Sequence, residues 1–75
     1  MNDTGMNYLR DLVRLIVQKA REAKKDRDSS NSAYDIGRLM AYHDIVSLIQ
    51  QQADAFNLSY DEIGLTRIDP ERDLL

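Results

Sequence analysis

His43 and its neighbour Asp44 are the residues of this chain best suited to acid–base or metal chemistry. A catalytic or metal-binding histidine needs partners that converge on it. The helical neighbours three and four positions away include Ser47 but no carboxylate. The Glu-x-x-His pairs of di-iron bundles and the H-E-x-x-H motif of zinc proteases are both absent. We therefore interpret His43 as a surface or interface imidazole.

The other chemically capable residues are dispersed along the chain. Asp44 and Asp54 are ten positions apart, and the glycines at positions 5, 37 and 64 are isolated, so no glycine-rich phosphate loop is present. The chain has no cysteine, which excludes disulfides and thiolate metal sites. The sequence predicts a non-enzymatic protein without cofactor or metal. An enzyme site formed between subunits stays open as a third alternative.

The elements that carry these residues are all predicted to be helical. The apolar spacing predicts one domain over residues 1–75, with a first helix over about 4–27, a turn over 28–31, a second helix over about 33–57 and a short helical tail over 58–75. The polar turn is typical of antiparallel neighbouring helices. We expect an antiparallel two-helix hairpin whose tail folds back over its open end.

Local signals mark the ends of these helices. Ser32 is predicted to cap the second helix, with Asp35 as its capping-box partner. In the tail the predicted caps and stops are Ser59 with Glu62, Gly64, and Asp69 with Pro70.

The second helix is apolar over more than half of its circumference. One apolar seam consists of Leu39, Tyr42, Val46, Ile49, Ala53 and Phe56. A second seam consists of Tyr34, Gly37, Ala41, Ile45, Leu48 and Ala55. A mostly polar stripe, with Met40, His43, Ser47, Gln50 and Asp54, fills the rest. Such a helix must pack on at least two partners, so we expect a homodimer that forms a four-helix bundle.

The two seams name the candidate core and dimer-interface residues. These are Leu39, Ala41, Tyr42, Ile45, Val46, Leu48, Ile49 and Phe56. Glycine inside a helix costs about 1 kcal/mol relative to alanine, which suggests a compensating contact at Gly37. Because small residues four apart let another helix approach closely, Gly37 and Ala41 are the candidates for a close helix contact.

The formal net charge is −3, but the cations are concentrated in the first helix. Residues 1–31 carry seven Lys or Arg against five Asp or Glu, and residues 32–75 carry three against eight. Arg14, Arg21 and Lys25 fall near one line of the first helix and are the candidate contacts for an anionic partner. Acidic overall charge counts against nucleic acid, because phosphate contacts supply most of that affinity.

The expected layout is similar to that of the plasmid protein Rop, an antiparallel helical hairpin that dimerises into a four-helix bundle. No sequence motif is shared. We predict a small homodimer that acts as a protein-interaction module, with a Rop-like RNA- or DNA-binding dimer as the alternative. The N-terminus has no signal-like segment, and no apolar run approaches the ~20 residues that span a bilayer, so we expect a cytoplasmic protein without membrane contact.

Overall fold

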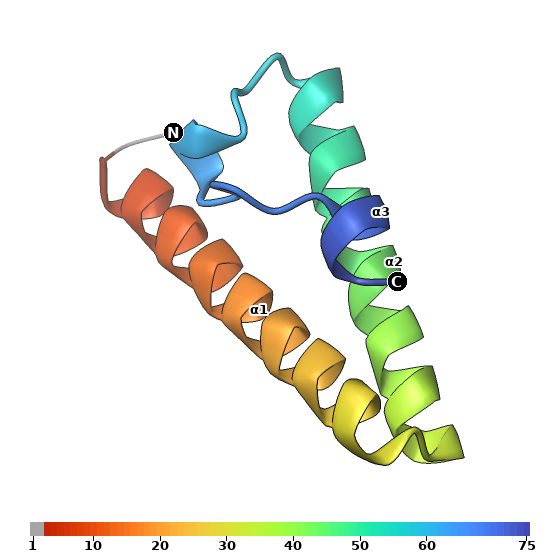
Figure 1. The fold of residues 1–75 in the computed structure, drawn as a ribbon. Coiled ribbons are helices and arrows are strands. Elements are labelled where there is room, and N and C mark those ends of the chain that lie inside the picture. The colour runs from red at the N-terminus through yellow and green to blue at the C-terminus, as the bar shows by residue number, and fades with distance from the viewer. Residues whose placement is uncertain (1–2) are drawn as a thin grey trace.

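The computed structural model describes residues 3–75, which form two long antiparallel helices and a short helical tail (Figure 1). The elements are α1 (Asp3–Ser30), α2 (Ala33–Ala55), a 3-10 turn η1 (Asp61–Ile63) and α3 (Pro70–Asp73). The two long helices lie close together at their connecting turn and diverge toward the other end, where η1 sits between them (Figure 1). The predicted all-α hairpin with a short helical tail is confirmed.

The turn between the long helices is shorter than predicted. α1 continues to Ser30, three residues beyond its expected end. The Ser29 hydroxyl donates to the Lys25 carbonyl (3.1 Å) inside the last turn. Asn31 then takes a left-handed conformation (φ 52°), and its N–H donates to the Arg27 carbonyl (2.8 Å). Asparagine tolerates this conformation at a helix C-terminus, so the polar residues that looked like a turn serve as the end of the helix.

The boundaries of α2 follow from local hydrogen bonds. The Ser32 side chain accepts a bond from the Asp35 N–H (3.1 Å), which confirms the predicted N-cap. The Asp35 carboxylate in turn accepts from the Ser32 hydroxyl (3.1 Å). The helix ends at Ala55, two residues before the expected position, and Asn57 reverses the chain with φ 56°.

The predicted signals in the tail also form. The Ser59 hydroxyl accepts from the Glu62 N–H (3.2 Å). Gly64 ends η1 in the left-handed region (φ 88°). Asp69 caps α3, where its side chain accepts an N–H from the second residue of that helix. These caps depend only on residues two or three positions apart.

The core lies along the contact between α1 and α2 and beneath the tail. The buried apolar residues are Val13, Val17, Ala20, Ala23, Leu39, Val46, Ala53, Ile63, Leu65, Ile68 and Leu74. The tail does more than cover the open end of the hairpin. It runs back along one side until the Leu75 main-chain oxygen accepts from Lys24 (2.6 Å) and Arg27 (3.0 Å) near the turn.

Gly64 lets the tail approach the backbone of α1. A Cβ atom at this position would lie 2.5 Å from the Arg10 carbonyl oxygen and 3.3 Å from the Arg14 nitrogen. The Arg10 side chain stabilises this approach of the tail to α1, because its Nε donates to the Glu62 carbonyl (3.1 Å). Glycine is therefore needed here for its backbone conformation and for its lack of a side chain.

Candidate functional site: the uncovered face of the hairpin

The tail is held against one side of both long helices. On α1, the Arg10 guanidinium donates to the Glu62 carbonyl (3.1 Å), and Arg21 donates to the Arg67 carbonyl (2.8 Å). These bonds join residues about fifty positions apart in the sequence. The side of α1 that carries Arg10 and Arg21 is therefore covered by the tail.

On α2, the tail packs against the polar stripe. The Gln50 amide donates to the Ile68 carbonyl (3.5 Å), and the Tyr60 hydroxyl donates to the Asp54 carboxylate (3.2 Å). The stripe therefore supplies hydrogen-bonding groups to the tail. The second apolar seam of α2 is left without this cover.

His43 belongs to the tail contact. Its Nε2 lies 3.2 Å from the Glu71 carboxylate in α3, and its Nδ1 lies 3.6 Å from Asp44. Within residues 3–75, no three His, Cys, Asp or Glu side chains converge to hold a metal ion. The contact between the His43 imidazole and the Glu71 carboxylate links α2 to α3. Sequence reasoning missed Glu71 because nothing local indicates where the tail turns back.

Most of the exposed apolar residues of the two long helices lie on the opposite side of the hairpin from the tail; Met40 and Ile36 are exceptions. Successive helix positions are 100° apart, so Leu12 and Arg14 flank the buried Val13 on opposite sides. The tail contacts of α1 lie on the Arg14 side. On α2, Ile45 flanks the buried Val46 on the side away from the tail. The uncovered face comprises Tyr8, Leu12 and Leu15 of α1, Tyr34, Ala41, Ile45 and Leu48 of α2, and Phe56, which directly follows α2.

The exposed fractions on this face are large for apolar side chains. Leu48 is 56% exposed, Phe56 71% and Tyr34 77%. The residues predicted as core or interface divide into two groups. Leu39 and Val46 are buried, and Tyr42 and Ile49 are half-buried between the helices. The exposed ones are Ala41, Ile45, Leu48 and Phe56. The structure thus uses most of the first seam for the hairpin itself and leaves the second seam open.

Gly37 makes no close contact within the described chain. A Cβ atom placed on it would meet nothing within 4 Å. The close helix contact expected of Gly37 and Ala41 is therefore not one between α1 and α2. A contact with a second copy of the chain stays a prediction.

A cavity opens at the end of the hairpin remote from the turn. Its volume is about 270 Å³. It is lined by Leu9, Ile49, Gln52, Ala53, Phe56, Leu58 and Ile63, from α1, α2 and the tail. Gln52 is the one polar side chain in this lining. Apolar pockets of this kind receive the anchor side chains of protein interfaces.

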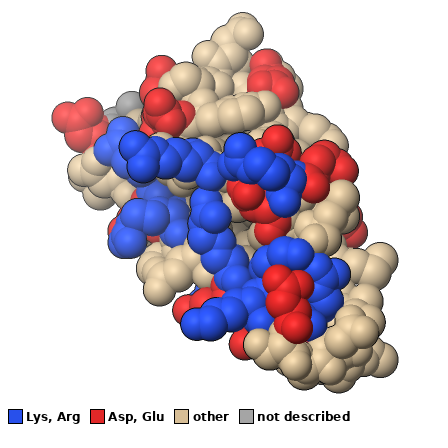
Figure 2. All heavy atoms as spheres, viewed as in Figure 1, with Lys and Arg blue, Asp and Glu red and all other residues tan. Residues whose placement is uncertain are grey.

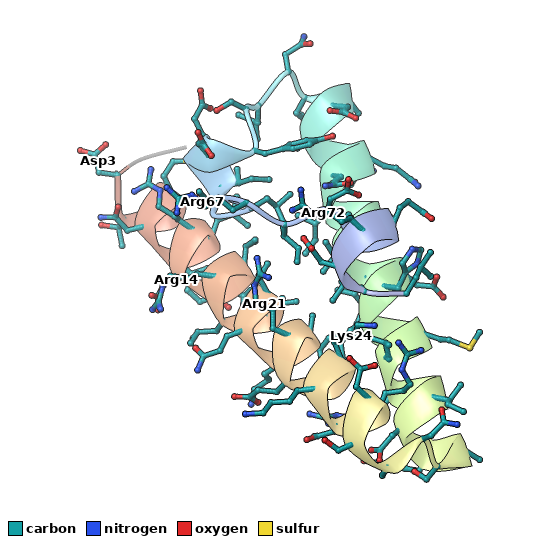
Figure 3. The ribbon with its side chains drawn as sticks, in the orientation of Figure 1. Asp3, Arg14, Arg21, Lys24, Arg67 and Arg72 are labelled. Atoms are coloured by element: carbon teal, nitrogen blue, oxygen red, sulfur yellow. The ribbon has the colours of Figure 1, made fainter. Side chains whose placement is uncertain are left out.

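The side covered by the tail is rich in cations (Figure 2). Lys and Arg side chains form a nearly continuous band over α1 and the tail (Figure 2). Arg14, Arg21 and Lys25 line one shallow cleft of about 410 Å³ along α1. The tail adds Arg67 and Arg72 to the same view (Figure 3). Charge counts along the chain do not predict this addition, because both arginines lie among residues 32–75, where Asp and Glu are in excess.

This cationic side is partly neutralised. Arg14 pairs with Asp11 (2.7 Å). Asp73 accepts from Arg72 (2.8 Å) and from the Asp69 N–H (2.9 Å). The Arg72 hydrogen bond and the Asp69 N–H hold the pKa of the Asp73 carboxyl well below its usual range.

Comparison of the chain with protein-family models, with curated proteins and with solved structures finds no match. In the described part of the chain, no helix combines the length and the apolar character needed to cross a membrane.

Proposed function

We propose that this protein is a non-catalytic helical homodimer that acts as a protein-interaction module. The observation that carries the proposal is the position of the tail. It packs on the polar stripe of α2 and leaves the uncovered face, with exposed Ile45 and Leu48, to solvent in a single chain. Contiguous exposed apolar residues of this kind mark interaction sites.

The size of the chain supports self-association. A chain of 75 residues gains only about 3–5 kcal/mol of stability from one core, so oligomerisation is a common means of support. A stable interface of ordinary size buries about 800 Å² per partner, which is about 15% of this chain's 5161 Å² of accessible surface. A face that runs along both long helices can supply that area.

Dimerisation through the uncovered face leaves the side covered by the tail facing outward on each subunit. That side offers Arg14, Arg21 and Lys25, together with Arg67, to an anionic partner. We propose an acidic segment of another protein as that partner. The Glu22 carboxylate lies beside these cations in the same cleft, and its negative charge disfavours binding of a continuous run of phosphates.

Two substitutions on α2 test the proposal as a matched pair. Leu48 is 56% exposed and lies on the uncovered face, whereas Met40 is 63% exposed and lies outside it. Leu48→Asp would place an unpaired charge in a dry interface, at a cost of roughly 3 kcal/mol or more, which weakens the dimer over a hundredfold. Met40→Asp should leave the dimer intact.

Sedimentation equilibrium over a range of concentrations measures both dissociation constants. Equal effects of the two substitutions would contradict the proposal, because both side chains are similarly exposed in a single chain and only an interface distinguishes them. Circular dichroism at high concentration confirms that each variant remains helical.

A nucleic-acid-binding dimer is the second candidate. The observation in its favour is that Arg67 and Arg72 lie on the same side of the molecule as the cations of α1 (Figure 2, Figure 3). The net charge of −3 opposes it. Asp28 and Asp73 also line a second cleft, which shares Arg21 and Lys25 with the first.

A further inference from the structure

The uncovered face carries a projection at one end and a hollow at the other. The projection is Tyr34, in the first turn of α2, whose side chain is 77% exposed. The hollow is the apolar cavity of about 270 Å³ at the open end, bordered by Ile49 of α2, by Phe56 at the C-terminal cap of α2 and by Leu9 of α1. When a second copy of this face is turned end to end, the projection of each copy faces the hollow of the other. The face is therefore complementary to itself in an antiparallel arrangement.

The spacing along α2 fits such a reversal. Tyr34, Ala41, Ile45, Gln52 and Phe56 follow one another at intervals of seven, four, seven and four, so they form one row on the helix. Tyr34 lies eleven residues before Ile45 and Phe56 lies eleven residues after it. Each interval corresponds to about 16 Å of helix. A two-fold axis that crosses the row at Ile45 therefore exchanges the positions of Tyr34 and Phe56.

We propose that two copies pack through the uncovered face with their α2 helices antiparallel and centred on Ile45. Each Tyr34 then packs against Phe56 of the other copy and enters its apolar cavity. This inference rests on the proposed homodimer and adds its geometry and its anchor residue. A closed two-fold contact of this type uses the same patch twice, so each interface contains two such insertions.

The charges along the row allow this pairing. The residues at 34, 41, 45, 48 and 52 of α2, at 56 directly after it, and at 8, 12 and 15 of α1 are all uncharged. Toward the turn, Arg38 is already paired with Asp26 (2.7 Å) and lies over the Tyr42 ring. The uncharged residues therefore bring no like charges together; Lys19, four positions after Leu15 and seven after Leu12, lies beside them on the turn side.

A parallel arrangement of the two α2 helices fits less well. It would bring Tyr34 against Tyr34 and cavity against cavity, which leaves both hollows unfilled. Unfilled apolar cavities forfeit packing energy. Parallel neighbours also align their helix dipoles unfavourably, whereas antiparallel neighbours oppose them.

Introduced cysteines test the geometry directly, because the chain has no cysteine of its own. Three single variants are prepared: Tyr34→Cys, Ile45→Cys and Phe56→Cys. Each is treated with a short bis-maleimide reagent, whose reach is far below the roughly 33 Å that twenty-two helical residues span. Ile45→Cys should cross-link to itself. Tyr34→Cys and Phe56→Cys should not cross-link alone but should do so when mixed.

The outcomes separate this inference from the proposed function. Self-cross-linking of Tyr34→Cys as efficient as that of Ile45→Cys would show parallel helices and overturn the geometry while the dimer stands. A dimeric mass with no cross-linking in any sample would also overturn it. A monomeric mass for the parent protein would refute the dimer itself.

The anchor is tested without cysteine by a matched pair at one position. Tyr34→Ala should raise the dimer dissociation constant by roughly 30-fold or more, as expected for a buried aromatic anchor. Tyr34→Phe should change it less than threefold, since the ring rather than the hydroxyl fills the cavity. In a single chain Tyr34 is exposed, so neither change should unfold the protein. Equal dissociation constants for the parent and Tyr34→Ala would contradict the insertion.

Discussion

Gly64→Ala is expected to undock the tail from α1. The new Cβ atom would lie 2.5 Å from the Arg10 carbonyl oxygen, a distance that real Cβ atoms essentially never reach. The obstacle is backbone, so it cannot rotate away as a side chain would. The tail can withdraw only by breaking the 3.1 Å bond between the Arg10 Nε and the Glu62 carbonyl.

The magnitude follows from two effects. A residue with a Cβ atom in the left-handed conformation (φ 88° at Gly64) costs roughly 1–2 kcal/mol, offset by about 0.4–1 kcal/mol because alanine restricts the unfolded chain. Overpacking against a fixed neighbour costs about 1–3 kcal/mol. The free energy of unfolding should therefore fall by roughly 1–4 kcal/mol.

Urea unfolding followed by circular dichroism measures this change at one fixed protein concentration. With a slope of about 1–2 kcal/mol per molar, typical of small proteins, the midpoint should fall by at least about 0.5 M. Arg67→Gly is the matched control, since Arg67 also has a left-handed φ (61°) in the tail. There glycine removes strain and adds unfolded-state freedom, so the two effects nearly cancel. A midpoint for Gly64→Ala within 0.3 M of the parent would refute the tail docking described above.

Three further results are expected. Asp73→Asn should destabilise the protein at pH 7, but the difference should shrink as the pH falls below about 4, because a carboxyl with a lowered folded-state pKa stabilises only while it is ionised; a difference that is constant with pH would contradict this. His43→Gln should cost less than about 1 kcal/mol and leave the dimer mass unchanged, and elemental analysis of the parent should find no stoichiometric metal, whereas metal lost on this substitution would contradict the non-catalytic proposal. Gel-shift assays with duplex or hairpin RNA and DNA should show no binding at physiological salt; micromolar, salt-sensitive binding that Arg21→Glu with Lys25→Glu abolishes would favour the nucleic-acid alternative.

The parts of the fold that the sequence predicts are those decided by near neighbours. The Ser32 cap depends on an N–H three residues away, and the stop at Gly64 depends on a left-handed φ that glycine adopts readily. α1 ends at Ser30, three residues later than the sequence predicts. A serine near a helix end can either start a turn or donate its hydroxyl back to a helix carbonyl. The Ser29 hydroxyl does the second, to the Lys25 carbonyl.

The path of the tail could not be predicted, because it depends on contacts between distant parts of the chain. Arg10 and Glu62 are 52 positions apart, and Lys24 and Leu75 are 51 apart. No local pattern indicates which side of the hairpin such a segment will choose. The sequence names both seams of α2 as candidates, and the path of the tail decides that the second seam stays exposed in a single chain.

The mass of the protein in solution tests the central claim most directly. Light scattering on the parent chain at tens of micromolar should give twice the chain mass of 8.7 kDa, because the uncovered face is then buried between two copies. A particle of 8.7 kDa that unfolds cooperatively at that concentration would contradict the claim.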